Sequence, residues 1–321
     1  MLTVFLFDER ESRRVEDWRA ALEQLGDDQL LWLALREPTE KDVAALQETL
    51  GLDEEEAHRL LEQPSRACVA DARERLQMTL YAAGDSRNQR VLIPVQCVLG
   101  PNWVITAHHE KLDVLEEFRE RAEGGGQVGG LDAPTFVAAL CEWVIASYFR
   151  AFEAVETHLE DFDAMVMAST PKNVSGALAR LVELRRLVGT LQRGLSPHRE
   201  VVVALIHPEL DLLSTDVSAD RFAALESRVA QALDTARDTR DSIFGSFDLL
   251  VAQTGLRTNE IVKVLTLATV VLLPATLLAG IMGMNFKVGF FDQAWMFWAV
   301  VAAMFGIAAL VLTVARSRRW I

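Results

Sequence analysis

The sequence has few of the residues that common catalytic and metal-binding motifs require. Its three cysteines, Cys68, Cys97 and Cys141, lie far apart and form no Cys-x-x-Cys pair. This spacing excludes a zinc ribbon and a disulfide framework, and it is typical of buried thiols in a reducing compartment. The sequence also shows no nucleophile with an adjacent base, no phosphate-binding loop and no metal-ligand spacing. It therefore predicts that the protein is not an enzyme.

Positive charge is also scarce, above all outside the last sixty residues. The chain carries 32 lysine and arginine residues against 46 aspartate and glutamate residues, a formal net charge of −14. Residues 1–260 hold 27 basic and 45 acidic residues, which gives this part a charge of about −18. Such a surface repels nucleic acid and attracts cations, so we expect no nucleic-acid partner. The alternative is that the acidic excess serves solubility alone.

Two runs near the C-terminus lack charge altogether. Val264 to Phe286 is 23 residues long without a charged side chain, and Ala294 to Ala315 is 22 residues long. Each run is long enough to cross the hydrocarbon layer of a bilayer, about 30 Å thick, as a helix. The sequence therefore predicts two transmembrane helices, at 264–286 and 294–315, joined by an external loop over 287–293.

The basic residues around these two runs predict their orientation, because lysine and arginine close to a span tend to stay on the cytoplasmic side. The loop contributes only Lys287, whereas five basic residues flank the outer ends of the runs: Arg257, Lys263, Arg316, Arg318 and Arg319. We therefore expect both termini in the cytoplasm, with 316–321 as a basic tail. The start, Met1 to Phe7, is interrupted at once by Asp8 and does not resemble a signal peptide. A bacterial-type inner membrane fits these features.

Residues 1–125 mix strand and helix signals and predict a small α/β domain. Short apolar or alternating runs indicate strands at Leu2–Phe7, Leu30–Leu35 and Arg75–Ala82. Val91–Ala107 reads as a β-hairpin around the turn residues Gly100-Pro101-Asn102. Helices are expected at Thr39–Leu50 and Asp53–Glu62, the second opened by a capping-box pattern, Asp53 with Glu56.

The region from Pro134 to the membrane is predicted to be almost entirely helical. Pro134–Ser169 and Asn173–Leu205 are amphipathic and are separated by Thr170-Pro171, which suggests an antiparallel pair within residues 131–210. A third helix begins near Asp216 or Ser218 and shows no convincing breaker before Pro274. At about 1.5 Å per residue it would extend for about 90 Å. We expect a stalk over 216–263 that continues into the first membrane span.

One face of this stalk carries a stripe of residues with a mean spacing of about 3.5, the period of helices packed around a common axis. It begins acidic, becomes small and apolar, and ends in threonines and glycines. A single hairpin cannot enclose a channel, so several copies must surround the axis if the stripe lines a path. The alternative for the three aspartates at its start is a solvated surface, for instance with an Arg237–Asp241 pair. The stripe comprises Asp234, Asp238, Asp241, Gly245, Asp248, Ala252, Gly255, Asn259, Val262, Thr266, Thr269, Leu273, Thr276, Gly280 and Gly283.

The end of the first span carries a family resemblance. Gly283-Met284-Asn285, followed closely by a second span, resembles the defining tripeptide of the CorA superfamily of divalent-cation channels. Leu273-Pro274-Ala275-Thr276 and the terminal Arg318-Arg319-Trp320 are similar to it too. The resemblance implies a funnel-shaped homopentamer with a cytoplasmic α/β domain and one central pore. It also implies intracellular metal, bound between protomers, as a brake on opening.

The chemistry of the stripe suits such a pore. Mg²⁺ holds its octahedral water shell tightly, so rings of neutral oxygens, Asn285 at the mouth and Thr276 within the span, can bind the shell without stripping it. The resemblance places Asp248 in a ring of the cytoplasmic part of the pore. It makes Val262, Leu265 and Leu273 hydrophobic constrictions, which close a channel by excluding water. The candidate pore residues are Gly283, Met284, Asn285, Thr276, Leu273, Thr269, Leu265, Val262 and Asp248, and the candidate regulatory metal ligands are Asp234, Asp238 and Asp241.

The transported ion is less clearly indicated. Many family members carry acidic residues in the external loop, but here 287–293 has no net charge. The prediction is a channel for Mg²⁺, with Co²⁺ or Ni²⁺ as further ions. Two alternatives remain: a ZntB-like Zn²⁺ transporter that uses a proton gradient, and a membrane-anchored metal sensor or scaffold that conducts nothing. Met284 in the tripeptide favours the CorA side, and the polar stripe argues against a plain anchor.

Overall fold

The chain folds into two compact units. The first comprises Met1–Phe162 and Asn173–Phe247, and the second comprises Asp163–Lys172 and Asp248–Ile321. The computed structural model describes residues 1–8, 12–26, 28–62, 64, 66–72, 75–84, 91–123, 132–168, 173–206, 216–284 and 294–318.

A seven-stranded sheet forms the centre of the first unit, in the order β2-β1-β3-β7-β6-β5-β4. β3 and β7 pair in parallel, and the other neighbouring strands pair antiparallel. The expected hairpin is confirmed as β6 and β7, and a Cβ on Gly100 at its turn would lie 2.2 Å from the Trp103 ring, so only glycine fits there. The strands are β1 (Leu2–Phe7), β2 (Ser12–Val15), β3 (Leu30–Arg36), β4 (Cys68–Ala72), β5 (Arg75–Ala83), β6 (Leu92–Leu99) and β7 (Trp103–His108).

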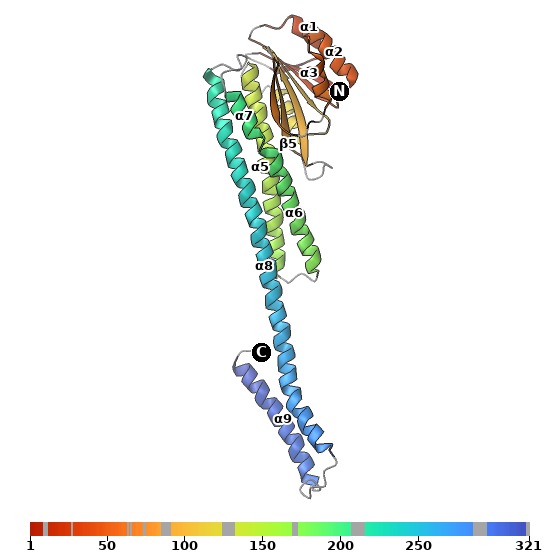
Figure 1. Ribbon diagram of the computed structural model, residues 1–321, viewed down its shortest axis with the longest axis vertical. Coiled ribbons are helices and arrows are strands. Elements are labelled where there is room, and N and C mark those ends of the chain that lie inside the picture. The colour runs from red at the N-terminus through yellow and green to blue at the C-terminus, as the bar shows by residue number, and fades with distance from the viewer. Residues whose placement is uncertain are drawn as a thin grey trace. The chain divides into compact units, whose positions relative to one another are not determined.

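Three short helices cover one face of this sheet (Figure 1): α1 (Trp18–Glu23), α2 (Glu40–Leu50) and α3 (Glu54–Leu61). The sequence predicted α2 and α3. Thr39 and Asp53 cap them in capping boxes, because each side chain accepts a hydrogen bond from the third helical amide. Leu46 and Leu60 pack against the apolar face of β1 and β3, which includes Leu31 and Leu33. This layer buries the alternate apolar residues of the strands.

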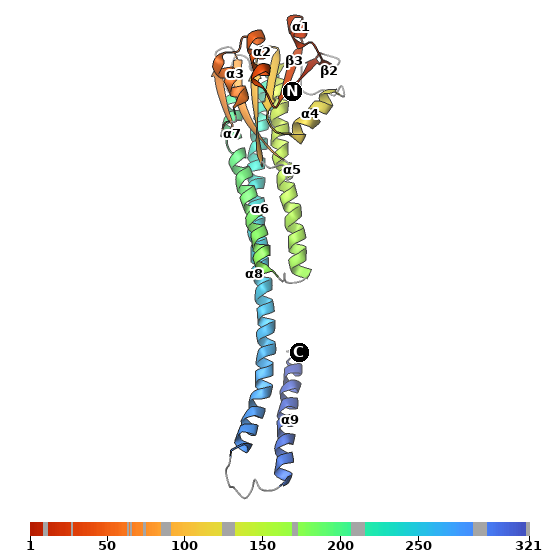
Figure 2. The same ribbon diagram turned by 90° about the vertical axis from the view of Figure 1, so that its right-hand side faces the viewer.

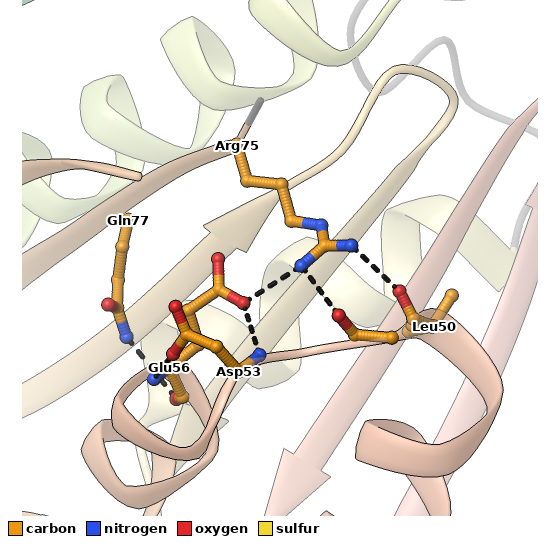
Figure 3. A network of polar contacts seen from close by, with 6 residues as sticks. Leu50, Asp53, Glu56, Arg75 and Gln77 are labelled. Carbon is orange, nitrogen blue, oxygen red and sulfur yellow. Dashed lines mark hydrogen bonds and ion pairs between the residues drawn. The ribbon is translucent and has the colours of Figure 1, made fainter. Parts of the chain in front are cut away.

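A buried ion pair joins α3 to β5 beneath this layer (Figure 3). Arg75 Nη1 lies 2.9 Å from Glu56 Oε2, and only 4% of the Glu56 side chain is exposed. The same guanidinium donates to the carbonyls of Leu50 and Gly51, both at 3.0 Å. Gly51 has φ 65°, the left-handed conformation that ends α2. Arg75 therefore satisfies the free carbonyls at the end of α2 as well as the charge of Glu56.

Aromatic residues fill the opposite face of the sheet, between β1 and β3 and the helices α4 (Asp113–Glu123) and α5 (Ala133–Ala168). The Trp32 ring lies 5.2 Å from Phe5, 5.2 Å from Phe118 and 5.3 Å from Phe136, between ring centroids. Its Nε1 donates to Thr106 Oγ1 at 2.9 Å, so the indole is both packed and hydrogen-bonded.

The helical layer differs from the expected pair in one respect. The first predicted helix is confirmed as α5, but the second, expected over Asn173–Leu205, consists of two helices, α6 (Val174–Leu195) and α7 (His198–Ile206). The break falls at Ser196-Pro197. Proline has no amide hydrogen and its ring clashes with the carbonyl four residues earlier, so a continuous helix was the wrong prediction there. Within the first unit, α5, α6 and the first part of α8 run side by side (Figures 1 and 2).

The long helix expected from Asp216 is confirmed as α8 (Asp216–Met282), which contains Pro274. In the second unit, α9 (Ala294–Ser317) runs back alongside the end of α8 (Figures 1 and 2). By length and composition, α5, α8 and α9 could each cross a membrane. However, 61% of the most apolar stretch of α5 is buried within the protein, against 0% for those of α8 and α9. The apolar residues of α5 therefore belong to the core of the first unit.

Candidate functional site

α8 presents two opposite faces in the first unit. Buried residues recur on one face at alternating spacings of three and four, and this face packs within the helical layer. There the Thr239 hydroxyl donates to Glu156 Oε1 at 2.9 Å. The stripe predicted from the sequence occupies the other side of the helix. Its described residues are exposed from Asp234 to Gly283 in the single chain. The buried residues are Phe222, Leu225, Val229, Ala232, Ala236, Thr239, Ile243 and Ser246.

The apolar part of α8 holds the predicted constriction residues. Val262, Leu265 and Leu273 are 53%, 65% and 61% exposed, respectively. Val262 and Leu273 lie on the stripe, and Leu265 lies one position to its side, next to Thr266. From Val262 to Gly283 the helix rises about 30 Å, the thickness of the hydrocarbon layer. In a single chain these side chains therefore lie one after another along one helix and form no common constriction.

The two threonines predicted to line the path have their hydroxyl hydrogens committed to the backbone. Thr269 Oγ1 donates to the carbonyl of Leu265 at 2.9 Å, and Thr276 Oγ1 donates to that of Leu272 at 2.5 Å. Each oxygen keeps its lone pairs as acceptors. The water molecules around a hydrated cation point their hydrogens outward and donate. The stripe thus offers acceptors of the polarity that a hydrated cation needs.

The signature tripeptide lies at the end of α8. The helix ends at Met282; the Gly283 amide donates to Ala279 O at 3.0 Å, and the Met284 amide donates to Ile281 O at 3.2 Å. Met284 is 56% exposed. Asn285, the predicted selectivity residue, and the predicted loop over 287–293 lie outside the described residues.

The acidic start of the stripe is exposed, with local ion pairs. Arg237 Nη1 lies 2.5 Å from Asp234 Oδ1, and Arg240 Nε lies 3.6 Å from Asp241 Oδ1. The predicted Arg237–Asp241 pair is therefore wrong, because Arg237 pairs with Asp234, one turn toward the N-terminus. Asp238 and Asp248 are exposed. Within the described part of the chain, no three histidine, cysteine, aspartate or glutamate side chains come together as metal ligands.

The cysteines provide no alternative metal centre in the first unit. Cys97 and Cys141 are buried free thiols, and Cys68 is half-buried. Burial, the largest cause, raises the pKa of the Cys141 thiol to about 12, and it also raises the pKa of Cys97. Both sulfurs are thus held in the neutral form, whereas a metal ligand or nucleophile must be the thiolate.

Comparison with known proteins identifies the family. The model of the family described as CorA-like Mg²⁺ transporter protein matches residues 27–316. The cobalt/magnesium transport protein CorA of Thermotoga maritima is 25% identical over 71% of this chain and 64% of its own length. That of Methanocaldococcus jannaschii is 21% identical over 92% of both chains.

The fold agrees with a solved structure along the whole chain. The complete structure of the CorA magnesium transporter from Methanocaldococcus jannaschii superposes with a TM-score of 0.80 at 18% identity, covering 100% of this chain and 99% of the other. At this identity the likeness concerns the α/β domain and the long helices alone. With the family match over residues 27–316, the chain belongs to the CorA-like Mg²⁺ transporter family and is a membrane transport protein, not an enzyme.

Proposed function

We propose that the chain is one subunit of a homopentameric divalent-cation channel in a bacterial-type inner membrane. The observation that carries the proposal is the stripe on α8, which is exposed in the single chain although it holds threonines within an apolar, span-length segment. Polar side chains are unfavourable against lipid, and copies of α8 around a common axis would remove them from it. The basic residues at the outer ends of the two charge-free runs support a cytoplasmic position for both termini.

In this assembly the stripe lines the ion path. Asn285 carbonyls form the selectivity ring at the mouth, next to Gly283 and Met284, and Thr276 and Thr269 present acceptors within the span. Val262, Leu265 and Leu273 form apolar rings that close the pore by excluding water. Asp248 forms a ring of carboxylates at the cytoplasmic side of these rings. The hydroxyl geometry of Thr269 and Thr276 supports this arrangement, because it leaves their oxygens free to accept.

The proposed ion is Mg²⁺, with Co²⁺ or Ni²⁺ as further substrates. The path holds neutral oxygens and no carboxylate from Val264 to Phe286. Such a path suits an ion that keeps its water shell, since carboxylates would bind it directly and hold it. The zinc alternative rests on the zero net charge of the external loop alone, where Lys287 balances Asp292. The scaffold alternative predicts no flux at all. It also leaves the threonines on the stripe without a role, since a membrane anchor needs no polar face.

Ion flux into liposomes that contain the purified full-length protein tests the proposal. We expect entry of Mg²⁺ and Co²⁺ along their concentration gradients, with little change when a pH gradient is imposed. Zn²⁺ entry that requires the pH gradient would replace the proposal with the proton-coupled alternative. Absence of flux for all three ions, in vesicles that contain the assembled oligomer, would leave the scaffold.

Regulation by internal metal follows from the acidic part of the stripe. Asp234, Asp238 and Asp241 are exposed, and the described part of one chain groups no three ligands. Carboxylate oxygens are suitable ligands for Mg²⁺, so a complete site would take carboxylates from neighbouring subunits. Carboxylates of adjacent subunits repel one another, and a bound divalent ion would stabilise their close approach. An ion that binds the closed state better shifts the equilibrium toward it.

The double variant Asp234→Asn/Asp238→Asn should therefore weaken inhibition by internal Mg²⁺. We expect the inhibitory concentration to rise about tenfold, which corresponds to the loss of about 1.4 kcal/mol of coupling. Asp248→Asn should instead lower the conduction rate, because it changes the ring nearest the pore. Flux at increasing internal Mg²⁺ measures both effects.

A matched control removes the same charge from another helix of the first unit. Glu160 and Asp161 are exposed on α5, so Glu160→Gln/Asp161→Asn should leave the inhibitory concentration unchanged. If the wild-type protein shows no inhibition between micromolar and tens of millimolar Mg²⁺, the brake does not exist and the aspartates are solvated surface.

A further inference from the structure

The edge of β5 is only partly covered by another strand. β4 pairs with residues Arg75 to Thr79 of β5, and within the described part of the chain no strand pairs with the last four residues, Leu80 to Ala83, on that side. Backbone groups at such an edge take partners other than a strand, because buried amides and carbonyls without hydrogen bonds are costly.

Three side chains from the helical layer supply these partners. The Tyr81 amide donates to His198 Nε2 at 3.0 Å, and the Ala83 amide donates to Ser147 Oγ at 2.9 Å. The Tyr148 hydroxyl donates to the carbonyl of Tyr81 at 2.8 Å. Ser147 and Tyr148 belong to α5, whereas His198 is the first residue of α7. The end of β5 is therefore held by two helices in place of a strand.

Of the two side chains that accept a hydrogen bond from a β5 amide, His198 and Ser147, only His198 is titratable. Its Nδ1 lies 3.0 Å from the carbonyl of Gly194 and 3.2 Å from that of Leu195, both acceptors, so Nδ1 carries the hydrogen. Nε2 then has the free lone pair that accepts from Tyr81. Only 2% of the residue is exposed. A proton added at Nε2 would place two donors face to face and break this contact.

The surroundings of His198 offer its protonated form little compensation. Across the ring lies the neutral phenol of Tyr148, with 5.8 Å between ring centroids and a pKa that burial raises well above its usual value. The phenol of Tyr81, on β5, donates to Pro64 O.

Glu200 on α7 and Glu226 on α8, which pairs with the neighbouring residue Arg199, are both already paired with arginines. Glu200 Oε2 lies 3.5 Å from Arg66, and Glu226 Oε1 lies 4.0 Å from Arg199. Burial, the largest cause, lowers the pKa of His198 to about 4, although the contacts with the Leu195 and Gly194 carbonyls oppose it.

We propose that His198 is an acid-sensitive latch that fastens the break between α6 and α7 to the uncovered end of β5. In the neutral form the imidazole joins the Tyr81 amide to the carbonyls of Gly194 and Leu195, so sheet and helices move as one body. Protonation releases the Tyr81 amide and loosens α7, the helix that precedes α8 in the chain. The latch adds a proton-dependent conformational step to a chain whose proposed regulation involves metal.

The direction of the pH dependence follows from linkage. In the open state the imidazole regains its ordinary pKa, about 6.5, so between about pH 6.5 and about pH 4 the open state binds more protons than the closed state. The closed state is therefore favoured above this window and loses its advantage as the pH falls through it. Relative to neutral pH, the opening constant should rise about tenfold at about pH 5.5 and about sixtyfold at about pH 4.5.

Hydrogen exchange of the full-length protein in lipid nanodiscs, read by mass spectrometry, tests the latch. After correction for the intrinsic exchange rate, protection of a peptide covering 80–83 should fall about tenfold between neutral pH and about pH 5.5. His198→Gln keeps an acceptor near the Nε2 position and does not titrate, so its protection at 80–83 should not respond to acid. His58→Gln is the control, because His58 is exposed on α3 and should leave the acid response intact.

An equal acid response at 80–83 in wild type and His198→Gln would overturn the latch, as would no response in the wild type. If His198→Gln fails to fold, the wild type alone decides. Loss of protection at 80–83 while 95–98 on β6 stays protected supports the latch, and uniform loss across both peptides overturns it.

Discussion

Replacing Asn285 with alanine should abolish divalent-cation flux and leave the oligomer assembled. Asn285 supplies the only side-chain carbonyl of the tripeptide Gly283-Met284-Asn285, and a ring of such groups replaces bulk water around the entering hydrated ion. We expect flux in liposomes to fall at least a hundredfold, equivalent to losing about 3 kcal/mol of stabilisation at the mouth. Native mass measurement should still show a closed ring, with five copies expected.

Thr313→Ala is the matched control for this variant. Thr313 is also a polar residue of the apolar C-terminal helices, but it lies on α9, away from the stripe, and its hydroxyl donates to Ala309 O at 2.7 Å. Its loss should change flux less than twofold. Normal uptake by a correctly assembled Asn285→Ala variant would contradict the assignment of Asn285 to the pore mouth. A stable monomer of the wild-type protein would contradict the proposed pore itself.

The second large effect is on stability, at the ion pair between α3 and β5. Arg75→Met leaves the buried carboxylate of Glu56 without its cation and the carbonyls of Leu50 and Gly51 without a donor. Breaking a buried pair from one side costs about 3 to 5 kcal/mol, because the remaining charge stays desolvated. Hydrogen exchange of the α2 and α3 amides in the full-length protein measures this as a drop in the free energy of opening.

Two further variants separate the buried charge from ordinary loss of a contact. Glu55→Gln breaks an exposed pair with Arg59 on the same helix and should cost less than about 0.5 kcal/mol. In Arg75→Met/Glu56→Gln no unpaired buried charge remains, so the double variant should recover part of the loss. If Arg75→Met is no more harmful than Glu55→Gln, the buried pair contributes little to the first unit.

Local patterns were sufficient for much of the fold. Alternation and apolar runs predicted β1, β3, β5 and the hairpin of β6 and β7, and the capping-box pattern of Asp53 with Glu56 predicted the start of α3. The capping box at the start of α2, formed by Thr39 and Asp42, was found only in the structure. Edge strand β2 escaped prediction, because Ser12 to Val15 has two adjacent arginines and no apolar alternation. It forms a strand because β1 offers it free backbone groups, a condition that no local pattern reports.

The stripe of candidate pore residues was also readable from the sequence, because a spacing of 3.5 is a property of one helix and needs no partner. The structure adds that the stripe lies on the exposed side of α8, opposite the buried face. The ring formed by several copies and the position of Asn285 remain proposals from the sequence and the family.

By itself the sequence determined the family, the charge-free lengths of the C-terminal segments and the periodicity of α8, because each is encoded within a short stretch of chain. Only the tertiary structure decided that α5, apolar enough to cross a membrane, packs instead on the sheet, and that His198 meets the Tyr81 amide, 117 residues away in the chain. Burial and hydrogen-bond partners depend on which distant surfaces meet. Contacts between residues that are distant in the sequence contribute to the free energy of folding only in the folded state, so no short stretch of sequence reports them.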